Sequence, residues 1–348
     1  MILFHNDYNE TCHPAVLAKL NETIGKQFPG YGMDEHCNNA AKLIRRKCER
    51  EDIAVHFLVG GTQTNLTVIA AALRPHQAVI AADSGHVNVH ETGAIESTGH
   101  KIIQLLPSNG KITAKQVEDV YLAQSLSDDA EHIAQPKLVY ISNPTEVGTT
   151  YSLEELTALH DTCAKHGLFL FVDGARLGYA LASDGYDVTL ADLARLTDAF
   201  YIGGTKVGAM FGEAVVISNP YIAEDFRYLI KQRGGMLAKG WLLGLQFEAL
   251  FENDLYFNIS RHADALADCL RDTLTRLGFQ LVGENKTNQV FVVLPNTLLE
   301  KLSNEFSYAA WERYDDTHTI VRFCTSWATK SENVDALCAA LERLTKTC

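Results

Sequence analysis

The eight cysteines of this chain form no CxxC pair and no cluster with histidine at the spacing of a zinc site. Reduced thiols in a cytoplasmic protein, and no bound metal, fit that pattern best. Apolar runs are also short, and none reaches the roughly 20 residues that a membrane-spanning helix needs. The N-terminus has no basic segment followed by a long apolar core, so we expect neither a signal peptide nor a membrane anchor.

Positive charge is scarce. Lysine and arginine together number 30 against 43 aspartates and glutamates, which gives a formal net charge of -13. Nucleic acids and anionic membranes both require clustered basic side chains, so neither is expected as a partner. The glycine patterns GxGxxG and GxxxxGK[ST] of nucleotide-binding loops are missing as well. A small molecule bound at a local basic site is the remaining expectation.

The composition is that of a globular protein. Of the 348 residues, 47% are hydrophobic and 21% are charged, which is enough for one large and one smaller domain. Strand-like and helix-like segments alternate from residue 54 to residue 165, which is typical of βαβ units and a mostly parallel sheet. The expected strands are 54–58, 78–82, 101–105 and 138–142, and the expected helices are 62–73, 87–96, 113–124 and 153–165.

We therefore predict the α/β class, with a large domain whose central, mostly parallel sheet is flanked by helices. Residues 1–25 form an N-terminal arm, 26–250 the large domain and 251–348 a smaller α+β domain. A strand at 214–217 precedes helical periodicity over 221–277, and the small domain is expected to hold strands at 280–282, 289–294 and 317–324 with a last helix at 332–344.

Two apolar segments, 168–173 and 198–203, have the length and composition of buried parallel strands and end abruptly in polar residues. The first ends at Asp173, and Lys206 lies just past the second. Because parallel strands deliver functional groups at their carboxyl ends, these two side chains are expected at one sheet edge. A carboxylate can keep a pyridinium nitrogen protonated, and a desolvated amine can form a Schiff base with an aldehyde, so the pair suggests pyridoxal phosphate. Taken singly, each residue is more commonly a turn cap or a solvated lysine.

Two further segments follow predicted strands. Gly60, Gly61 and Thr62 open a predicted helix, where backbone N–H groups can hold a phosphate, although a glycine pair is also the usual solution for a tight turn. His86 follows the next strand, where it could stack on a pyridine ring and take part in proton transfer, or only cap the helix after it.

With these motifs in place, the chain resembles the threonine aldolase and β-eliminating lyase family, which are pyridoxal-phosphate enzymes of the aspartate-aminotransferase fold. The resemblance covers essentially the whole chain. The matching segments are Asn6-Asp7, Tyr31-Gly-Met-Asp34, Gly61-Thr-Gln63, His86, Asp173-Gly-Ala-Arg176, Lys206 and Arg322-Phe-Cys-Thr325.

The resemblance assigns a role to each of these positions. It implies that Lys206 carries the cofactor, that Asp173 pairs with the pyridine nitrogen and that His86 stacks on the ring. Arg176 and Arg322 would bind the substrate carboxylate as forked, charge-assisted donors, with Asn6 beside the substrate. Arg176 is also expected near the cofactor.

Three positions depart from the family pattern. Asn143-Pro-Thr145 stands where the family usually has Asn-Thr-His, so Thr145 replaces a substrate-facing imidazole. Gly234-Gly-Met-Leu237 lacks the arginine of Gly-Gly-Met-Arg, and Asn6 replaces a serine. A threonine cannot act as a base near neutral pH, so the proton of a substrate hydroxyl must go to His86, a bound water or an unidentified residue.

By resemblance, the expected activity is cleavage of L-threonine, L-allo-threonine or a related β-hydroxy amino acid to glycine and an aldehyde, in a homodimer or homotetramer. The missing imidazole leaves a second reading open, in which the same cofactor serves β-elimination or transamination of another amino acid. A non-catalytic binding protein, or a nicotinamide enzyme, is a different class, and the nicotinamide enzyme lacks its fingerprint here.

Overall fold

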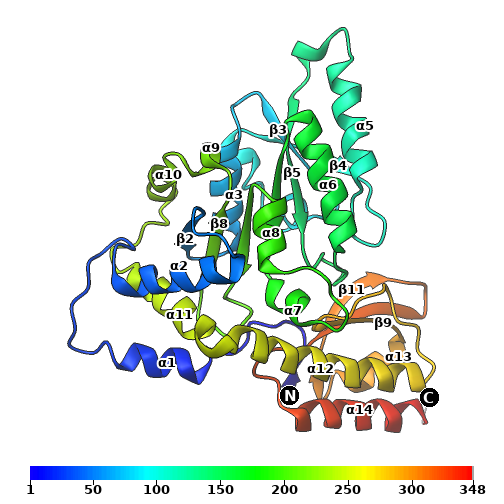
Figure 1. Cartoon of the computed structure of the whole chain (residues 1–348). Coiled ribbons are helices and arrows are strands. Elements are labelled where there is room, and N and C mark those ends of the chain that lie inside the picture. The colour runs from blue at the N-terminus through cyan, green and yellow to red at the C-terminus, as the bar shows by residue number, and fades with distance from the viewer. Residues whose placement is uncertain (347–348) are drawn as a thin grey trace.

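The computed structural model describes residues 1–346, which fold around a seven-stranded and a three-stranded sheet (Figure 1). Strands β4, β3, β5, β6 and β7 run parallel, whereas β8 is antiparallel to both of its neighbours. The predicted α/β class with a mostly parallel sheet is therefore confirmed. In spatial order the large sheet contains β2 (Ala54–Leu58), β8 (Glu213–Ile217), β7 (Ala199–Gly203), β6 (Phe169–Asp173), β5 (Gln135–Ser142), β3 (Gln77–Ala82) and β4 (Lys101–Leu105).

Helices cover both faces of the large sheet. Side chains alternate along each strand, so that Phe171 of β6 enters one core and Val172 the other. Because both faces are buried, the strands read in sequence as continuous apolar runs. The core that contains Val172 is closed by α2 (Glu35–Cys48), α5 (Ala114–Ser125), α6 (Leu153–His166), α8 (Leu190–Leu196) and α11 (Trp241–Phe251). The core that contains Phe171 is closed by α3 (Gly61–Ala72), α4 (His86–Val89), α9 (Pro220–Ala223) and α10 (Phe226–Gln232).

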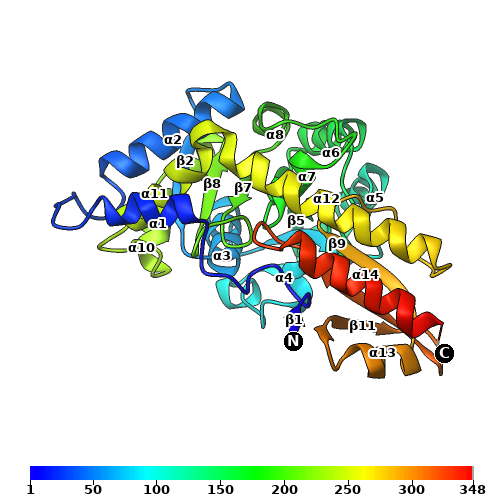
Figure 2. The same cartoon turned by 90° about the horizontal axis from the view of Figure 1, so that it is seen from below.

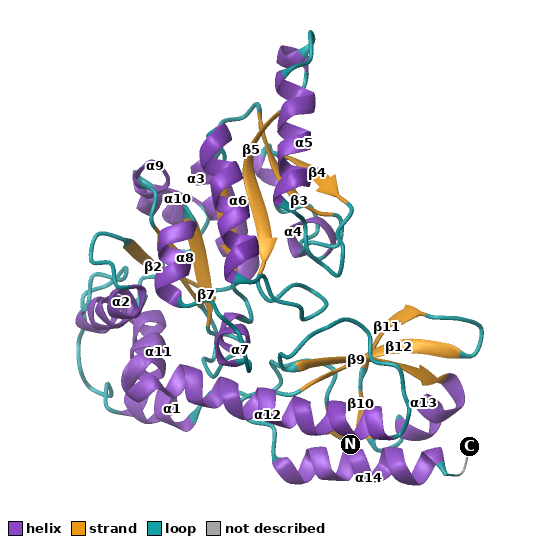
Figure 3. Ribbon diagram, turned by 45° about the vertical axis from the view of Figure 1, so that its right-hand side comes forward, coloured by secondary structure: helices purple, strands orange, loops and turns teal. Residues whose placement is uncertain are grey.

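The three-stranded sheet lies apart from the large one (Figure 3). It is antiparallel and consists of β11 (Ala309–Arg313), β12 (His318–Cys324) and β9 (Gln289–Pro295). The short strand β1 (Ile2–Leu3) pairs in parallel with β10 (Phe306–Ser307), which brings the N-terminus to this region. Its helices are α13 (Asn296–Leu302) and α14 (Ser331–Thr345).

Helix α12 (Leu255–Arg276) runs along both parts of the molecule (Figure 2). It packs against α7 (Leu177–Ala182) at one end and against α14 at the other, while α1 (Pro14–Asn21) packs on α11. The division of the chain at about residue 250 stays a prediction. None of the helices in residues 1–346 is both long and apolar enough to cross a membrane.

Several predicted elements are wrong in extent. The helix expected at 87–96 ends after Val89, because Thr92 and Gly93 adopt left-handed φ values of 52° and 70° that a helix cannot continue through. The helical region 221–277 is divided into α9, α10, α11 and α12, with left-handed backbone at Gly234 and Asn253 between them.

The strand expected at 280–282 is reduced to one bridge, between Leu281 and Val292. Helices α8 and α13 and strand β11 were not predicted.

Candidate active site

A cavity of about 390 Å³ opens at the carboxyl ends of β5, β6 and β7. That volume lies within the range of small-molecule and cofactor sites. All of the predicted site residues except Asn6 and Arg322 line it, namely Gly60, Gly61, Thr62, His86, Thr145, Asp173, Arg176 and Lys206. The structure therefore brings together residues that are far apart in the sequence.

Close packing of two strand ends positions the central pair. A Cβ atom added at Gly174 would lie 1.9 Å from the carbonyl oxygen of Tyr201, so only glycine allows β6 and β7 to approach this closely. The N–H group of Gly203 donates to the carbonyl oxygen of Gly174 at 2.9 Å. As a result Asp173, at the end of β6, and Lys206, in the loop after β7, reach the same cavity.

The Asp173 carboxylate accepts four hydrogen bonds. Its Oδ2 accepts from the Tyr140 hydroxyl at 2.6 Å and from Asn65 Nδ2 at 3.0 Å. Its Oδ1 accepts from the Tyr201 hydroxyl and from the backbone N–H of Ala175. Four donors fix both oxygens in place and favour the charged form of the group.

The charge of Asp173 is retained despite its burial. Burial alone would raise the pKa of this carboxyl, but the neighbouring His86 and the hydrogen bonds from Tyr140, Tyr201 and Asn65 hold it below its ordinary value. The cavity therefore contains a fixed anion, which is what a protonated pyridine nitrogen needs as its partner.

His86 is tied to the same network. Its Nδ1 lies 2.7 Å from Oε1 of Glu91, and that oxygen also accepts from Asn65 Nδ2 at 2.7 Å. Burial lowers the pKa of His86, but the Glu91 and Asp173 carboxylates outweigh that effect and raise it. The imidazole therefore keeps its proton to higher pH than a free histidine does.

Lys206 is a buried amine whose pKa is lowered, in contrast to the raised pKa of His86. Burial and the nearby Arg176 guanidinium lower its pKa against the opposing charges of Asp7 and Asp173. Its backbone is held by the Tyr179 hydroxyl, which donates to the Lys206 carbonyl oxygen at 2.6 Å. An amine that loses its proton more readily is a better nucleophile toward an aldehyde.

The N-terminus of α3 offers an anion site to the same cavity. Gly60 is its N-cap in extended backbone and supplies no side-chain cap, and apart from its two chain neighbours no described residue comes within 4 Å of the place where its Cβ would be. The first-turn amides at Gly61 and Thr62 are therefore open to a phosphate group, which the positive end of the helix would also attract. Amine, anion and phosphate cradle together fit pyridoxal phosphate.

Arg176 is already engaged in an ion pair. Its Nε lies 2.7 Å from Oδ2 of Asp7, and its Nη2 lies 2.9 Å from Oδ1. Asn288 donates to the same carboxylate at 2.8 Å. Burial would raise the pKa of Asp7, but the Arg176 charge and the hydrogen bonds lower it. The role of Arg176 toward a substrate carboxylate stays a prediction, and its guanidinium fork is shared with Asp7.

Replacing Asp7 with asparagine is expected to cost about 3 kcal/mol of unfolding free energy, at the low end of the 3–5 kcal/mol found for broken buried pairs. Asparagine keeps one accepting oxygen but leaves the Arg176 charge uncompensated. Since the folded-state pKa of Asp7 is depressed, its stabilisation is present above the ordinary carboxyl pKa and is lost as pH falls through the folded value. The difference between wild type and variant should therefore shrink in acid.

Urea unfolding at neutral and at acidic pH measures this effect. Asp119→Asn breaks an exposed pair with Lys115 and serves as the control, for which no change in midpoint is expected. An Asp7→Asn variant as stable as the wild type at neutral pH would contradict the prediction.

Arg322 and Asn6 are not among the residues that line the cavity. The Arg322 guanidinium lies 5.1 Å from the centroid of the Trp311 ring, and it donates to Gln289 Oε1 and to the carbonyl oxygen of His5, both at 3.2 Å. Its Nε is buried without a partner among the described residues. Asn6 uses its Oδ1 to accept from the backbone N–H of Tyr8. Binding of a substrate by these two residues stays a prediction.

Sequence reasoning missed Glu146. Its Oε1 accepts from the Ser142 hydroxyl at 2.6 Å and from the backbone N–H of His86 at 2.9 Å, and the residue lines the cavity. The signal in the sequence was an acidic residue four positions after the end of a buried strand. The neighbouring Thr145 is buried, and its hydroxyl lies 2.7 Å from that of Thr149.

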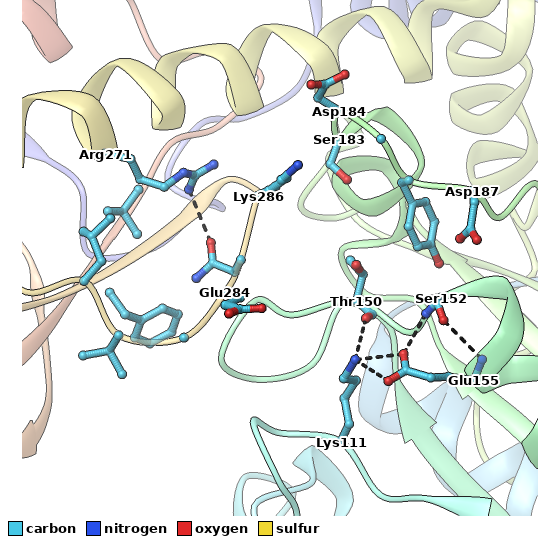
Figure 4. Close-up of a pocket in the computed structure, with 18 of the residues that line it drawn as sticks. Lys111, Thr150, Ser152, Glu155, Ser183, Asp184, Asp187, Arg271, Glu284 and Lys286 are labelled. Atoms are coloured by element: carbon cyan, nitrogen blue, oxygen red, sulfur yellow. Dashed lines mark hydrogen bonds and ion pairs between the residues drawn. The ribbon is translucent and has the colours of Figure 1, made fainter. Parts of the chain in front are cut away.

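A larger cavity of about 720 Å³ lies elsewhere (Figure 4). It is lined by the first residues of α6, by residues 183–187 after α7 and by the loop at 281–286. Two of its basic groups already have partners: Lys111 Nζ lies 2.6 Å from Glu155 Oε1, and Arg271 donates to Asn285 Oδ1 at 3.3 Å. Asn285 also donates to the carbonyl oxygen of Val147, so this side of the molecule supports the loop that carries Glu146.

The fold and the smaller cavity together define a pyridoxal-phosphate enzyme, in which a buried lysine, a charged aspartate and an open helix N-terminus meet at one sheet edge. The family model described as beta-eliminating lyase matches residues 16–297, and the chain belongs to this family of lyases.

Relatives and solved structures agree with that membership. A low specificity L-threonine aldolase of a Pseudomonas species is 30% identical over 338 residues, covering 96% of this chain and 95% of the relative. The solved structure of Leishmania major threonine aldolase has 46% sequence identity and a TM-score of 0.97, covering 99% of this chain and all of that chain. Aspartate aminotransferase from Thermus thermophilus, at 16% identity and a TM-score of 0.71, covers 99% of this chain and 91% of its own, and shares the fold.

Proposed function

We propose that this protein cleaves L-threonine, L-allo-threonine or a related β-hydroxy amino acid to glycine and an aldehyde. The observation that carries the proposal is the convergence of Lys206, Asp173 and the open N-terminus of α3 on one cavity. The reaction is inferred from the similar proteins, because the Pseudomonas and Leishmania proteins are both threonine aldolases.

Six of the predicted cavity residues are proposed to hold the cofactor. Lys206 would hold the cofactor covalently, Asp173 would pair with its ring nitrogen, and Gly60, Gly61 and Thr62 would bind its phosphate. The imidazole of His86, anchored by Glu91, would lie on the ring. When bound, pyridoxal phosphate supplies the electron sink for the pair released as the Cα–Cβ bond breaks.

An amino acid substrate also needs a site for its carboxylate. Arg176 and Arg322 are proposed to bind it, with Asn6 beside them. Two guanidinium groups in a chain of net charge -13 would attract an anion locally. Arg322 comes from β12 of the small sheet and Arg176 from the loop after β6, so the substrate would bridge both parts of the molecule.

Product analysis tests the proposal. Purified protein loaded with pyridoxal phosphate is incubated with threonine, and glycine and acetaldehyde are quantified alongside ammonia and keto acid. Glycine and aldehyde in equal amounts support aldol cleavage. Faster release of ammonia and a keto acid would replace it with β-elimination or transamination on the same cofactor.

Arg322→Lys is expected to lower kcat/KM for threonine, which corresponds to a rise of about 1.5–3 kcal/mol in activation free energy. The reason is that lysine keeps the charge but cannot donate two parallel hydrogen bonds. Steady-state kinetics on threonine measures the loss. Arg313→Lys, at an exposed arginine of β11, is the control and should behave as the wild type. Unchanged kcat/KM in Arg322→Lys would remove this residue from carboxylate binding.

We further propose a homodimer or homotetramer in the cytoplasm. Large apolar side chains are exposed along the first 33 residues, and a second copy could bury them. These are Met1, Leu3, Tyr8, Leu17, Ile24, Tyr31 and Met33. All seven cysteines among the described residues are free thiols, which suits a reducing compartment. Sedimentation of the holoenzyme tests the oligomer.

A further inference from the structure

Aldol cleavage needs a base for the proton of the substrate's β-hydroxyl group, and two obvious candidates are unsuited to that task. Thr145 is buried, its hydroxyl is engaged with that of Thr149, and an alcohol does not accept a proton near neutral pH. His86 is already engaged with Glu91 through Nδ1 at 2.7 Å, and its ring is the proposed partner of the cofactor ring.

Three carboxylates line the cavity, and two of them have both oxygens occupied. Asp173 accepts four hydrogen bonds. Glu213 accepts from the backbone N–H of Gly204 at one oxygen and from the Thr205 hydroxyl at the other. Glu146 differs, because both hydrogen bonds that it accepts from other residues go to Oε1, and no other described residue donates to Oε2.

Glu146 is also held in position. The Ser142 hydroxyl and the backbone N–H of His86 fix its carboxylate from two elements, β5 and α4. The loop around it is fastened from the other part of the molecule, since Thr287 donates to the carbonyl oxygen of Gly148. A carboxylate with one fixed and one open oxygen, in the cavity that holds Lys206, is placed as a general base needs to be.

We propose that Glu146 is the general base that takes the proton from the β-hydroxyl group of the substrate. The inference rests on the aldol cleavage proposed above. The O–H bond breaks toward Glu146, its electron pair forms the aldehyde C=O bond, and the Cα–Cβ bond breaks with its electron pair left on Cα. A proton added later at Cα completes glycine and balances the one that Glu146 accepts.

The surroundings of Glu146 raise its pKa, which favours this role. Burial and the Asp173 charge raise its pKa, while hydrogen bonds from the Ser142 hydroxyl and from the backbone N–H groups of Glu146 and His86 moderate the rise. A carboxylate with a raised pKa is a stronger base in its deprotonated form. The other titratable groups around it are the Tyr140 and Tyr151 hydroxyls, the His86 imidazole and, across the cavity, Lys206 and Arg176.

Glu146→Gln tests the proposal, because glutamine keeps the size and an accepting oxygen but cannot take a proton. In the holoenzyme, threonine cleavage is expected to fall by about 10²-fold. Exchange of the glycine α-proton with deuterium needs no β-hydroxyl proton transfer and should keep the wild-type rate. Glu154→Gln removes an exposed carboxylate on α6 and is the matched control, for which neither reaction should change.

A second variant tests the residue through its pKa. Ser142→Ala removes a hydrogen bond that lowers the pKa of Glu146, so the acid limb of kcat/KM should move to higher pH. A readout without substrate comes from the infrared band of the protonated carboxyl. The Glu146 contribution is the part of that band which Glu146→Gln lacks, because Glu213 and Asp264 also have raised pKa values. This part should titrate above the ordinary glutamate pKa in wild type and shift upward in Ser142→Ala.

The outcomes separate this inference from the proposed function. Wild-type protein that exchanges glycine but does not cleave threonine would overturn the aldolase reading. If the wild type cleaves threonine and Glu146→Gln cleaves it equally well, the aldolase reading stands and the base is not Glu146. An equal loss of cleavage and exchange would also overturn the inference, since Glu146 would then act on the cofactor or on the fold.

Discussion

Replacing Lys206 with alanine is expected to lower turnover by about 10⁴-fold, the upper end of what one proton-transferring side chain contributes. The expected loss is this large because the buried amine is proposed to serve twice, as the covalent anchor of the cofactor and as a nearby base of lowered pKa. The fold should survive, because alanine removes a buried amine and leaves in place the hydrogen bond from the Tyr179 hydroxyl to the carbonyl oxygen of residue 206.

Borohydride reduction followed by peptide mapping gives the direct measurement. In wild type the reduced cofactor should be found on Lys206, and in Lys206→Ala no lysine should carry it. Lys115→Ala, at an exposed lysine of α5, is the control and should retain both the label and the activity. Label on another lysine of the Lys206→Ala protein, with turnover preserved, would show that the anchor lies elsewhere.

The sequence was sufficient to predict the central pair of the site. Asp173 and Lys206 each follow an apolar run with a sharp end, and the carboxyl ends of parallel strands meet at one edge. Local patterns of this kind need no knowledge of distant parts of the chain. For the same reason the glycine turn before α3 could be placed beside them.

Contacts between segments that are distant in the sequence could not be predicted from local patterns. The pair between Asp7 and Arg176 joins residues 169 positions apart, and nothing in either segment indicates the other. The hydrogen bonds from Tyr140 and Tyr201 to Asp173 depend on which face of each strand points toward α3, and this is settled only when the sheet is assembled.

Local backbone geometry explains the wrong helix boundaries. Thr92 adopts a left-handed conformation that its residue type does not suggest, so the apolar spacing over 87–96 indicated a helix that the backbone does not form. Glu146 could not be predicted from the sequence, because its position depends on contacts with Ser142 and with the backbone of His86, which belong to two different elements.

Asp173→Asn is expected to lower kcat by about 10²–10³-fold, the size of effect found when one fixed electrostatic partner of a transition state is removed. Asparagine has nearly the same shape, so the change isolates the charge. Without the anion, the pKa of the cofactor's ring nitrogen falls, and the ring accepts electrons less readily when bound. The amide also meets donors on every side, because Tyr140, Tyr201 and Asn65 all point hydrogens at this position.

Asn65 cannot relieve that conflict by turning its amide, because the same Nδ2 atom also donates to Glu91 at 2.7 Å. One donor is therefore left unsatisfied, and we expect a further loss of about 1–3 kcal/mol in stability. Tyr140→Phe is the control: it removes one hydrogen bond but keeps the Asp173 charge, so its kcat should fall far less. Cofactor titration by absorbance, threonine kinetics and urea unfolding on both variants measure the three effects. If Asp173→Asn and Tyr140→Phe lose equal activity, the hydrogen bonds and not the charge of Asp173 are what the cofactor requires.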